Sequence, residues 1–145
     1  MANPHLEADY LFMQGVICQR IEEQTQFNVR GIDSLVQATE NDVRDAVVYV
    51  LYEGERIVDT GGKGANLLTG QRYSALLGLA NATQNDEAAR NGAAGPMLSK
   101  LHKALAGWAP EQAHTRTLRR ITGRTPIYTP NFGLYPLTFE ILLNL

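Results

Sequence analysis

The chain has 145 residues, of which 44% are hydrophobic and 19% are charged, which is the composition of a globular protein and not of a disordered one. This length suits a single domain, residues 1–145, and is too short for two well-formed cores. The formal net charge of −2 argues against a dedicated nucleic-acid-binding protein, which usually has a basic surface. One cysteine, Cys18, excludes an intramolecular disulfide and a cysteine-based zinc site.

The first 25 residues are predicted to form a helix and not a targeting segment. The N-terminus lacks the basic start and apolar run of a signal peptide, and no stretch has the length of a membrane span. We therefore expect a soluble chain with no membrane partner. Apolar residues recur every three or four positions from Pro4 to Gln24, which predicts one continuous helix.

The next part of the chain is predicted to be extended and then to turn. Residues 27–30 form a short extended piece that Gly31 ends, and Asp33 is expected to cap one or two turns over residues 34–38. Residues 45–53 are rich in β-branched and aromatic side chains on both faces, so this segment is predicted to be a strand in the middle of the sheet.

Glycines divide the middle of the chain. Residues 53–55 are predicted to turn, so that residues 56–59 return as the second strand of a hairpin. Residues 60–70 contain four glycines, which predicts a flexible loop, and residues 71–81 form the next strand.

The clearest helix lies between residues 93 and 107. Its apolar residues lie three or four positions apart and form one stripe: Met97, Leu98, Leu101, Ala104 and Leu105. Gly107 is expected to end the helix in a left-handed conformation. A capping-box-like sequence at Thr83 begins the helical region, and Gly95-Pro96 is expected to kink or interrupt it. We expect Leu101, Leu105 and Trp108 to be buried against residues 47–51.

The C-terminal part is predicted to be extended. Residues 116–122 are a weakly patterned strand, residues 126–129 continue extended, and residues 134–144 alternate as a strand with one apolar face. The order of helix, strands, helix and strands indicates an α+β fold: a mostly antiparallel sheet with helices packed on one face, in a single domain.

The glycine-rich loop is the first candidate binding segment. Gly61-Gly62-Lys63-Gly64 is not a phosphate-binding loop, because that motif needs Ser or Thr after the lysine and a helix behind it. An interaction loop is the better interpretation, and its candidate contacts are Lys63, Leu67 and Leu68.

Four arginines form the second candidate surface: Arg116, Arg119, Arg120 and Arg124. They indicate an edge strand protected by charge, ion pairs with a neighbouring subunit, or a face toward an acidic partner or DNA phosphates. Phe132, in the turn region 123–133, is a further candidate interface residue.

No catalytic set is evident in the sequence. The three histidines, at positions 5, 102 and 114, do not have metal-ligand spacing with another potential ligand. Cys18 has no context of a nucleophile and is best explained as a small, mostly buried residue. We therefore expect no catalytic residues, no metal, no cofactor and no enzymatic activity.

Five segments resemble the tail terminator, or tail completion, family of long-tailed bacteriophages and prophages. They are the N-terminal helix, residues 46–54, residues 71–73, the helix end Ala104-Leu-Ala-Gly-Trp-Ala-Pro110, and residues 135–143. This family includes the lambda-type terminator and Mu-like prophage tail proteins. The piece ending in Gly-Trp-Ala-Pro is its most specific part.

The resemblance implies a structural virion protein with no catalytic residues to transfer. It implies an α+β subunit that forms a hexameric ring on the end of the tail tube, stops tube polymerisation and presents a surface for head attachment. The implied partners are copies of itself, the tail tube protein and head–tail connector or neck proteins, with DNA only as cargo. The implied location is the virion tail, after assembly in the host cytoplasm, and the isolated subunit is expected to be monomeric at low concentration.

Two alternatives remain at this point. One is a different phage neck or minor tail protein, since the family is divergent. The other is a small cytoplasmic ligand-binding domain or enzyme whose pocket the sequence does not mark.

Overall fold

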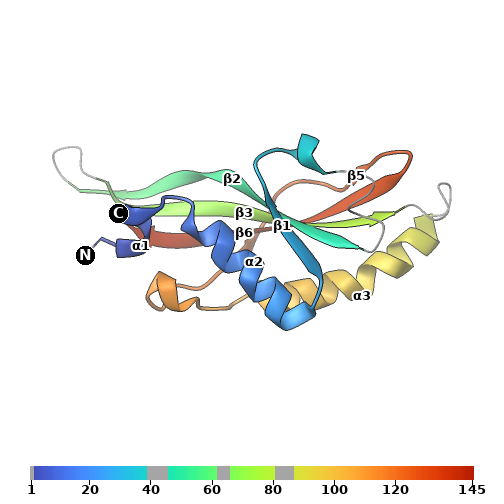
Figure 1. The fold of residues 1–145 in the computed structure, drawn as a ribbon. Helices are drawn as coiled ribbons and strands as arrows, with labels where there is room; N and C mark the ends of the chain where they lie inside the picture. The colour runs from blue at the N-terminus through green and yellow to red at the C-terminus, as the bar shows by residue number, and fades with distance from the viewer. Residues whose placement is uncertain (1, 39–45, 62–65, 81–86) are drawn as a thin grey trace.

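A computed structural model describes residues 2–38, 46–61, 66–80 and 87–145 (Figure 1). Its helices, its strands and two short 3-10 turns, labelled η, follow one another along the chain. In order they are α1 (Pro4–Ala8), α2 (Phe12–Thr25), β1 (Asn28–Ile32), η1 (Leu35–Gln37), β2 (Val47–Thr60), β3 (Asn66–Ala80), α3 (Glu87–Leu105), η4 (Glu111–Ala113), β4 (Arg119–Ile121), β5 (Ile127–Tyr128) and β6 (Phe132–Asn144).

The described strands form one sheet in the order β1-β2-β3-β6-β4, with β5 also paired to β6. The β1–β2 pair is parallel, and the other pairs are antiparallel. The long strands β2, β3 and β6 form its centre, and α2 and α3 lie together on one side of it (Figure 1). The predicted α+β class, with helices on one face of a mostly antiparallel sheet, is confirmed.

The main core lies between the helices and this face of the sheet. Both helices and the three long strands contribute fully buried side chains, among them Ile17, Leu105, Val48, Leu77 and Ile141. Along each of these strands every second residue belongs to this core, because successive side chains of a strand point to opposite faces. We call this the helix face of the sheet.

The opposite face has an apolar half and a polar half. Its apolar half contains Val47, Tyr49, Leu51, Leu76 and Leu134, and it packs against residues near η1 and β5. Figure 1 shows these two short elements on the side of the sheet away from α2 and α3. The polar half carries the charged cluster described below.

The first predicted helix is two helices. The chain leaves α1 at Asp9, whose backbone is extended, and the Asp9 carboxylate accepts a hydrogen bond of 3.0 Å from the backbone N–H of Leu11. Asp competes with helical hydrogen bonds in this way, and this explains why a helical apolar rhythm did not give one helix. α1 consequently lies at the end of the sheet near both chain termini (Figure 1).

Gly31 lies within β1 and does not end the strand. The amide of Gln14 on α2 donates hydrogen bonds to the carbonyls of Ile32 and Val50, at 3.1 and 2.9 Å. A Cβ at Gly31 would lie 3.1 Å from this amide, so glycine here makes room for a helix-to-sheet contact. The short turn that follows is η1, and its capping residue is Ser34 rather than Asp33.

The predicted hairpin at residues 53–55 is wrong, because β2 continues through this segment to Thr60. The pairing register with β3 shifts between Tyr52 and Gly54, and Gly54 has a φ of +105°. Glycine here permits a β-bulge, which adds a residue to one strand without reversing the chain. The partner strand is β3, which begins at Asn66 and therefore includes half of the predicted loop.

α3 is also continuous where an interruption was expected. It passes through Gly95 and Pro96, although proline lacks the N–H that would bond the carbonyl of Gly92. Pro96 and Gly92 are both exposed, so water can bind that carbonyl. The Thr83 capping sequence lies outside the described residues.

The end of α3 confirms the predicted stop, but Trp108 is less buried than expected. Gly107 has a φ of +77°, as expected for a left-handed helix end. Leu101 and Leu105 are fully buried in one core with Val48 and Val50, and the main contacts of α3 are with α2, β3 and β6. Trp108 is half-buried, and its ring lies 4.9 Å from the guanidinium carbon of Arg20.

The C-terminal strands match the sequence pattern in position but are partly shorter. β4 covers three residues and β5 two, whereas β6 runs from Phe132 to Asn144 with its predicted apolar side toward the helices. In the part of the chain that the structure describes, no helix combines the length and the apolar character needed to cross a membrane.

Candidate assembly surface

The polar half of the helix-free face gathers charged residues from four strands. In the antiparallel register Arg72 of β3 lies opposite Glu140 of β6, and Arg119 of β4 lies opposite the same Glu140. Arg56 of β2 is paired with Gly70. Residues directly opposite one another point to the same side of a sheet, so the register brings these side chains together.

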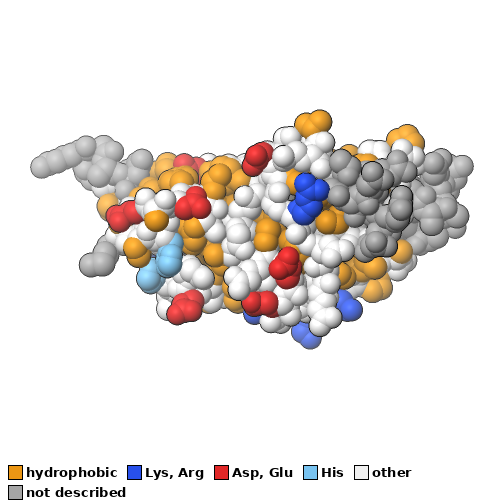
Figure 2. Space-filling view, viewed as in Figure 1, with side chains coloured by type: hydrophobic (Ala, Val, Ile, Leu, Met, Phe, Trp, Pro, Cys, Tyr) orange, Lys and Arg blue, Asp and Glu red, His pale blue; other side chains and the backbone are white. Residues whose placement is uncertain are grey.

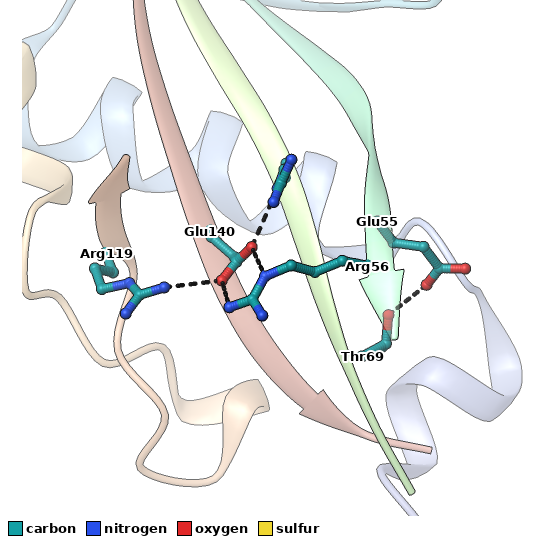
Figure 3. Close-up of polar contacts among 6 residues, drawn as sticks. Glu55, Arg56, Thr69, Arg119 and Glu140 are labelled. Carbon is teal, nitrogen blue, oxygen red and sulfur yellow. Dashed lines mark hydrogen bonds and ion pairs between the residues drawn. The ribbon is translucent and has the colours of Figure 1, made fainter. Parts of the chain in front are cut away.

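Glu140 is the centre of this cluster. Its side chain is only 2% exposed, and Arg56 donates to both of its carboxylate oxygens, at 2.8 and 2.7 Å. Arg72 donates at 3.1 Å and Arg119 at 3.0 Å (Figure 3). A buried carboxylate is unfavourable unless it is paired and hydrogen-bonded, and three guanidinium groups meet that requirement.

The backbone under the cluster is adapted to it. A Cβ at Gly70 would lie 2.9 Å from the carboxyl carbon of Glu140, which is closer than real Cβ contacts. Gly70 therefore lets the carboxylate lie flat over β3, within reach of Arg56 on β2.

The same contacts shift the protonation of Glu140. Hydrogen bonds from Arg56 lower the pKa of the Glu140 carboxyl most, and their effect outweighs that of burial, which raises it. With the further hydrogen bond from Arg72, the pKa falls from 4.5 to about 2. The carboxylate is therefore charged throughout the neutral range, and its charge is needed to hold the arginines.

A second ion pair extends the cluster. Glu53 accepts hydrogen bonds from Arg124, at 2.5 and 2.8 Å, and from the Ser74 hydroxyl at 2.7 Å. Burial alone would raise the pKa of Glu53, but these hydrogen bonds outweigh it and the pKa is lowered. The loop that carries Arg124 lies close against Thr138 of β6. A Cβ at Gly123 would lie 1.9 Å from the Thr138 hydroxyl oxygen, so only glycine fits at this position of the loop.

A hollow of about 300 Å³ lies at one edge of the cluster. Its lining residues are Thr115, Arg116, Thr117, Arg119, Glu140 and Leu142. Within the described residues Arg116 has no ion-pair partner, and its side chain is half-buried. The hollow therefore combines cationic groups with an apolar side chain, which suits an anionic or mixed protein surface rather than an apolar ligand.

The structure brings together only some of the predicted arginines. Arg119 and Arg124 belong to the cluster, and Arg116 lines the hollow beside it. Arg120 lies apart, with its guanidinium carbon 5.9 Å from the centre of the Phe139 ring on the helix face. Whether these residues contact a partner stays a prediction.

The other predicted contacts are dispersed. Leu67 is 50% exposed and Leu68 is half-buried, and both lie in β3 rather than in a loop. Lys63 lies outside the described residues. Phe132 is half-buried and packs against the second apolar cluster, so much of its ring already has an intramolecular role.

Sequence reasoning missed the central residues of the cluster, namely Glu140, Arg56, Arg72 and Glu53. The available signal was Glu140, the one acidic residue in a strand whose alternate positions are apolar. Its partners could not be identified because their proximity depends on the β2–β3–β6 register, and the bulge at Gly54 sets that register for Arg56.

A different polar contact lies on the helix face near the β2–β3 hairpin end. The Glu55 carboxylate accepts hydrogen bonds from the hydroxyls of Tyr10 and Thr69. Burial and the bond to Glu55 raise the pKa of Tyr10 to about 12. Figure 3 shows Arg56 pointing toward Glu140 while its neighbour Glu55 points away from it.

The Glu140 cluster is not suited to proton-transfer chemistry. Arginines stay protonated and serve as donors only, so the Glu140 cluster can hold strands together and attract anions. Burial, and to a smaller extent Glu22, raises the pKa of the Cys18 thiol to about 11, so this thiol stays protonated near neutral pH. Among the described residues no group of three potential metal ligands is found.

Comparison with known families gives a match over most of the chain. The profile of the family described as phage tail terminator protein matches residues 8–144, nearly the whole chain. A search of curated proteins finds no match.

Proposed function

The chain belongs to the phage tail terminator family, and from this premise we propose that it caps the tail tube as a ring, ends tube polymerisation and provides the head-attachment surface. The family assignment itself makes the chain a structural component of the phage tail, from a family that is not one of enzymes. The observation that carries the proposal is the extent of the match, which includes every strand of the sheet.

The surface of the subunit supports a role in assembly. The arginines around Glu140 link the strands and still remain accessible to a partner, since their side chains are 42–64% exposed. Apolar side chains are exposed near the hairpin end, including Ile57, Val58 and Leu67. Exposed apolar groups beside charged ones are typical of surfaces that bind other proteins.

The proposal includes partners and location. The chain would bind copies of itself, the tail tube protein and the neck proteins of the head, and DNA would pass through the ring as cargo. Assembly would take place in the host cytoplasm. No enzymatic activity is required by this function, and we propose that the chain has none.

Removal of the gene from a phage that encodes this chain is the direct genetic test. We expect electron micrographs of lysates to show full heads without tails and tubes of uncontrolled length. Supplying the wild-type chain from a plasmid should restore normal tails. Tails of normal length joined to heads without the chain would contradict the proposal.

A further inference from the structure

Two surfaces of the chain carry opposite charge on opposite faces of the same sheet. The first, which we call the arginine face, consists of Arg56, Arg72, Arg119 and Arg124 with Glu53 and Glu140, next to the hollow at Arg116. The second, the acidic hairpin end, consists of Asp9, Tyr10, Glu55, Ile57 and Leu67 on the helix face.

The register places the acidic hairpin end on one side of the sheet. Glu55 is paired with Gln71 and Ile57 with Thr69, whereas Arg56 between them is paired with Gly70 on the arginine face. The Gln71 amide donates a 2.7 Å hydrogen bond to the carbonyl of Tyr10, which fixes the turn after α1 against the hairpin. Figure 2, viewed from the same side as Figure 1, shows acidic and apolar side chains together at the end of the molecule that holds α1.

The acidic groups of this surface are not neutralised within the subunit. Among the described residues, Glu55 is bound by two hydroxyl groups and Asp9 by a backbone N–H, and neither has an ion-pair partner. Beside them Tyr10 is 39% exposed, Ile57 43% and Leu67 50%. An acidic surface with exposed apolar side chains is therefore available to a partner.

The arginine face has the complementary character. Its four arginines and two glutamates leave an excess of two positive charges, in a chain whose net charge is −2. Arg116 adds a further cation at the hollow, where Leu142 offers an apolar contact. Positive and negative surfaces that each include apolar contacts can bind one another specifically.

We propose that the acidic hairpin end of one copy binds the arginine face and the hollow at Arg116 of a second copy. The inference rests on the proposed function, in which copies form a ring. Two different surfaces of one chain that complement each other make a head-to-tail contact, and such contacts close into rings when the rotation between copies allows it. Charge complementarity selects a second copy as the occupant, since both halves of the contact are present on this chain.

Charge reversal on the full chain tests this contact. The first variant is Glu55→Lys, and the second is Arg116→Glu, which removes none of the ion pairs formed by Glu140 or Glu53. Glu55→Gln removes the charge but keeps a hydrogen-bond acceptor for Tyr10 and Thr69, and therefore separates charge from folding. Glu111→Lys, an exposed residue of η4, is the matched control. Circular dichroism and thermal melting establish that each variant is folded.

Self-association is measured by analytical ultracentrifugation over a concentration series extending to the millimolar range. We expect the wild-type chain and Glu111→Lys to associate equally and the two reversals to associate roughly tenfold or more weakly, because like charges then face each other. Glu55→Gln should weaken association less, and added salt should weaken wild-type association.

A head-to-tail contact also gives a specific mixing pattern. A mixture of Glu55→Lys and Arg116→Glu contains one intact acidic end with one intact arginine face, and its two reversed surfaces are again opposite in charge, so the mixture should associate more strongly than either variant alone. The double variant Glu55→Lys/Arg116→Glu should recover association beyond the dimer. Equal association of all folded variants, the absence of wild-type association at every concentration, or failure of the double variant to exceed the singles would overturn the inference.

The proposed function is separated from this contact by a second readout. Binding to purified tail tubes is measured for the same variants by electron microscopy. Normal self-association with no binding to tubes would contradict the proposed function and leave the contact intact. Loss of tube binding in the charge-reversal variants with unchanged self-association would assign the surface to the tube protein and refute the contact between copies.

Discussion

Arg56 donates to both carboxylate oxygens of Glu140, although the two residues lie on strands that are not neighbours in the sheet. The contact passes over Gly70 of the intervening strand, where a side chain would occupy the same space. One buried carboxylate thereby links four strands of the sheet, through Arg56, Arg72 and Arg119.

Substitution of Glu140 by Gln should destabilise the fold. The change removes the charge from the hydrogen bonds of three arginines, and we expect a loss of roughly 1–3 kcal/mol because the arginines are exposed enough to be hydrated afterwards. Urea unfolding followed by circular dichroism measures the change. Glu111→Gln, at an exposed site, should have no effect, and equal stability of both variants would contradict the role assigned to Glu140.

The stability of the chain should fall on acidification, in part through Glu140. The folded-state pKa is lowered from 4.5 to about 2, so the contribution of the carboxylate is complete above pH 4.5 and is lost as the pH falls toward 2. Unfolding free energies measured across this window should decline less steeply for Glu140→Gln than for the wild type. Glu53 has a lowered pKa too, and it leaves a residual slope in the variant. Identical slopes would mean that Glu140 does not titrate in this way.

Two glycine-to-alanine changes should have opposite effects. A Cβ at Gly15 of α2 meets no atom within 4 Å, so Gly15→Ala should stabilise the chain by about 0.5–1 kcal/mol through the better helix propensity of alanine. Gly123→Ala should destabilise it, because the new carbon would overlap the Thr138 hydroxyl. Thermal melting of both variants checks this, and a neutral Gly123→Ala would show that the loop moves freely away from β6.

Leu105 should matter more for stability than Trp108. Leu105 is fully buried between the helices and the sheet, and Leu105→Ala should lower the free energy of unfolding by about 2–5 kcal/mol. Trp108 is half-buried beneath Arg20, so Trp108→Ala should have the smaller effect. Chemical denaturation of the two variants compares them directly, and a larger loss for Trp108→Ala would place the core nearer the end of α3.

The fold class followed from the sequence because its signals are local. The alternation of residues 134–144 predicted β6 and its core-facing side, and the stripe ending at Gly107 predicted the buried part of α3. The errors came where a glycine has more than one physical use. Gly54 forms a bulge and not a turn, and Gly31 makes room for the Gln14 amide inside a strand.

The candidate surface was only partly predictable for a different reason. Arg119 and Arg124 stood out because arginines are clustered in their short segment, but their partners Glu140 and Glu53 are distant in sequence. The contacts depend on register between three long strands, and no local pattern specifies that register. Leu67 was expected to be a contact residue in a loop, whereas its place in β3, on the same side of the sheet as Glu55 and Ile57, required the structure.

Growth of tail tubes in the presence of the purified chain tests the central claim most directly. Tube protein is allowed to polymerise with increasing amounts of the chain, and tube lengths are measured by electron microscopy. The account predicts shorter tubes as the chain is added, with the chain bound at one tube end as a ring. Tubes that keep their length distribution and carry no ring at either end would contradict it.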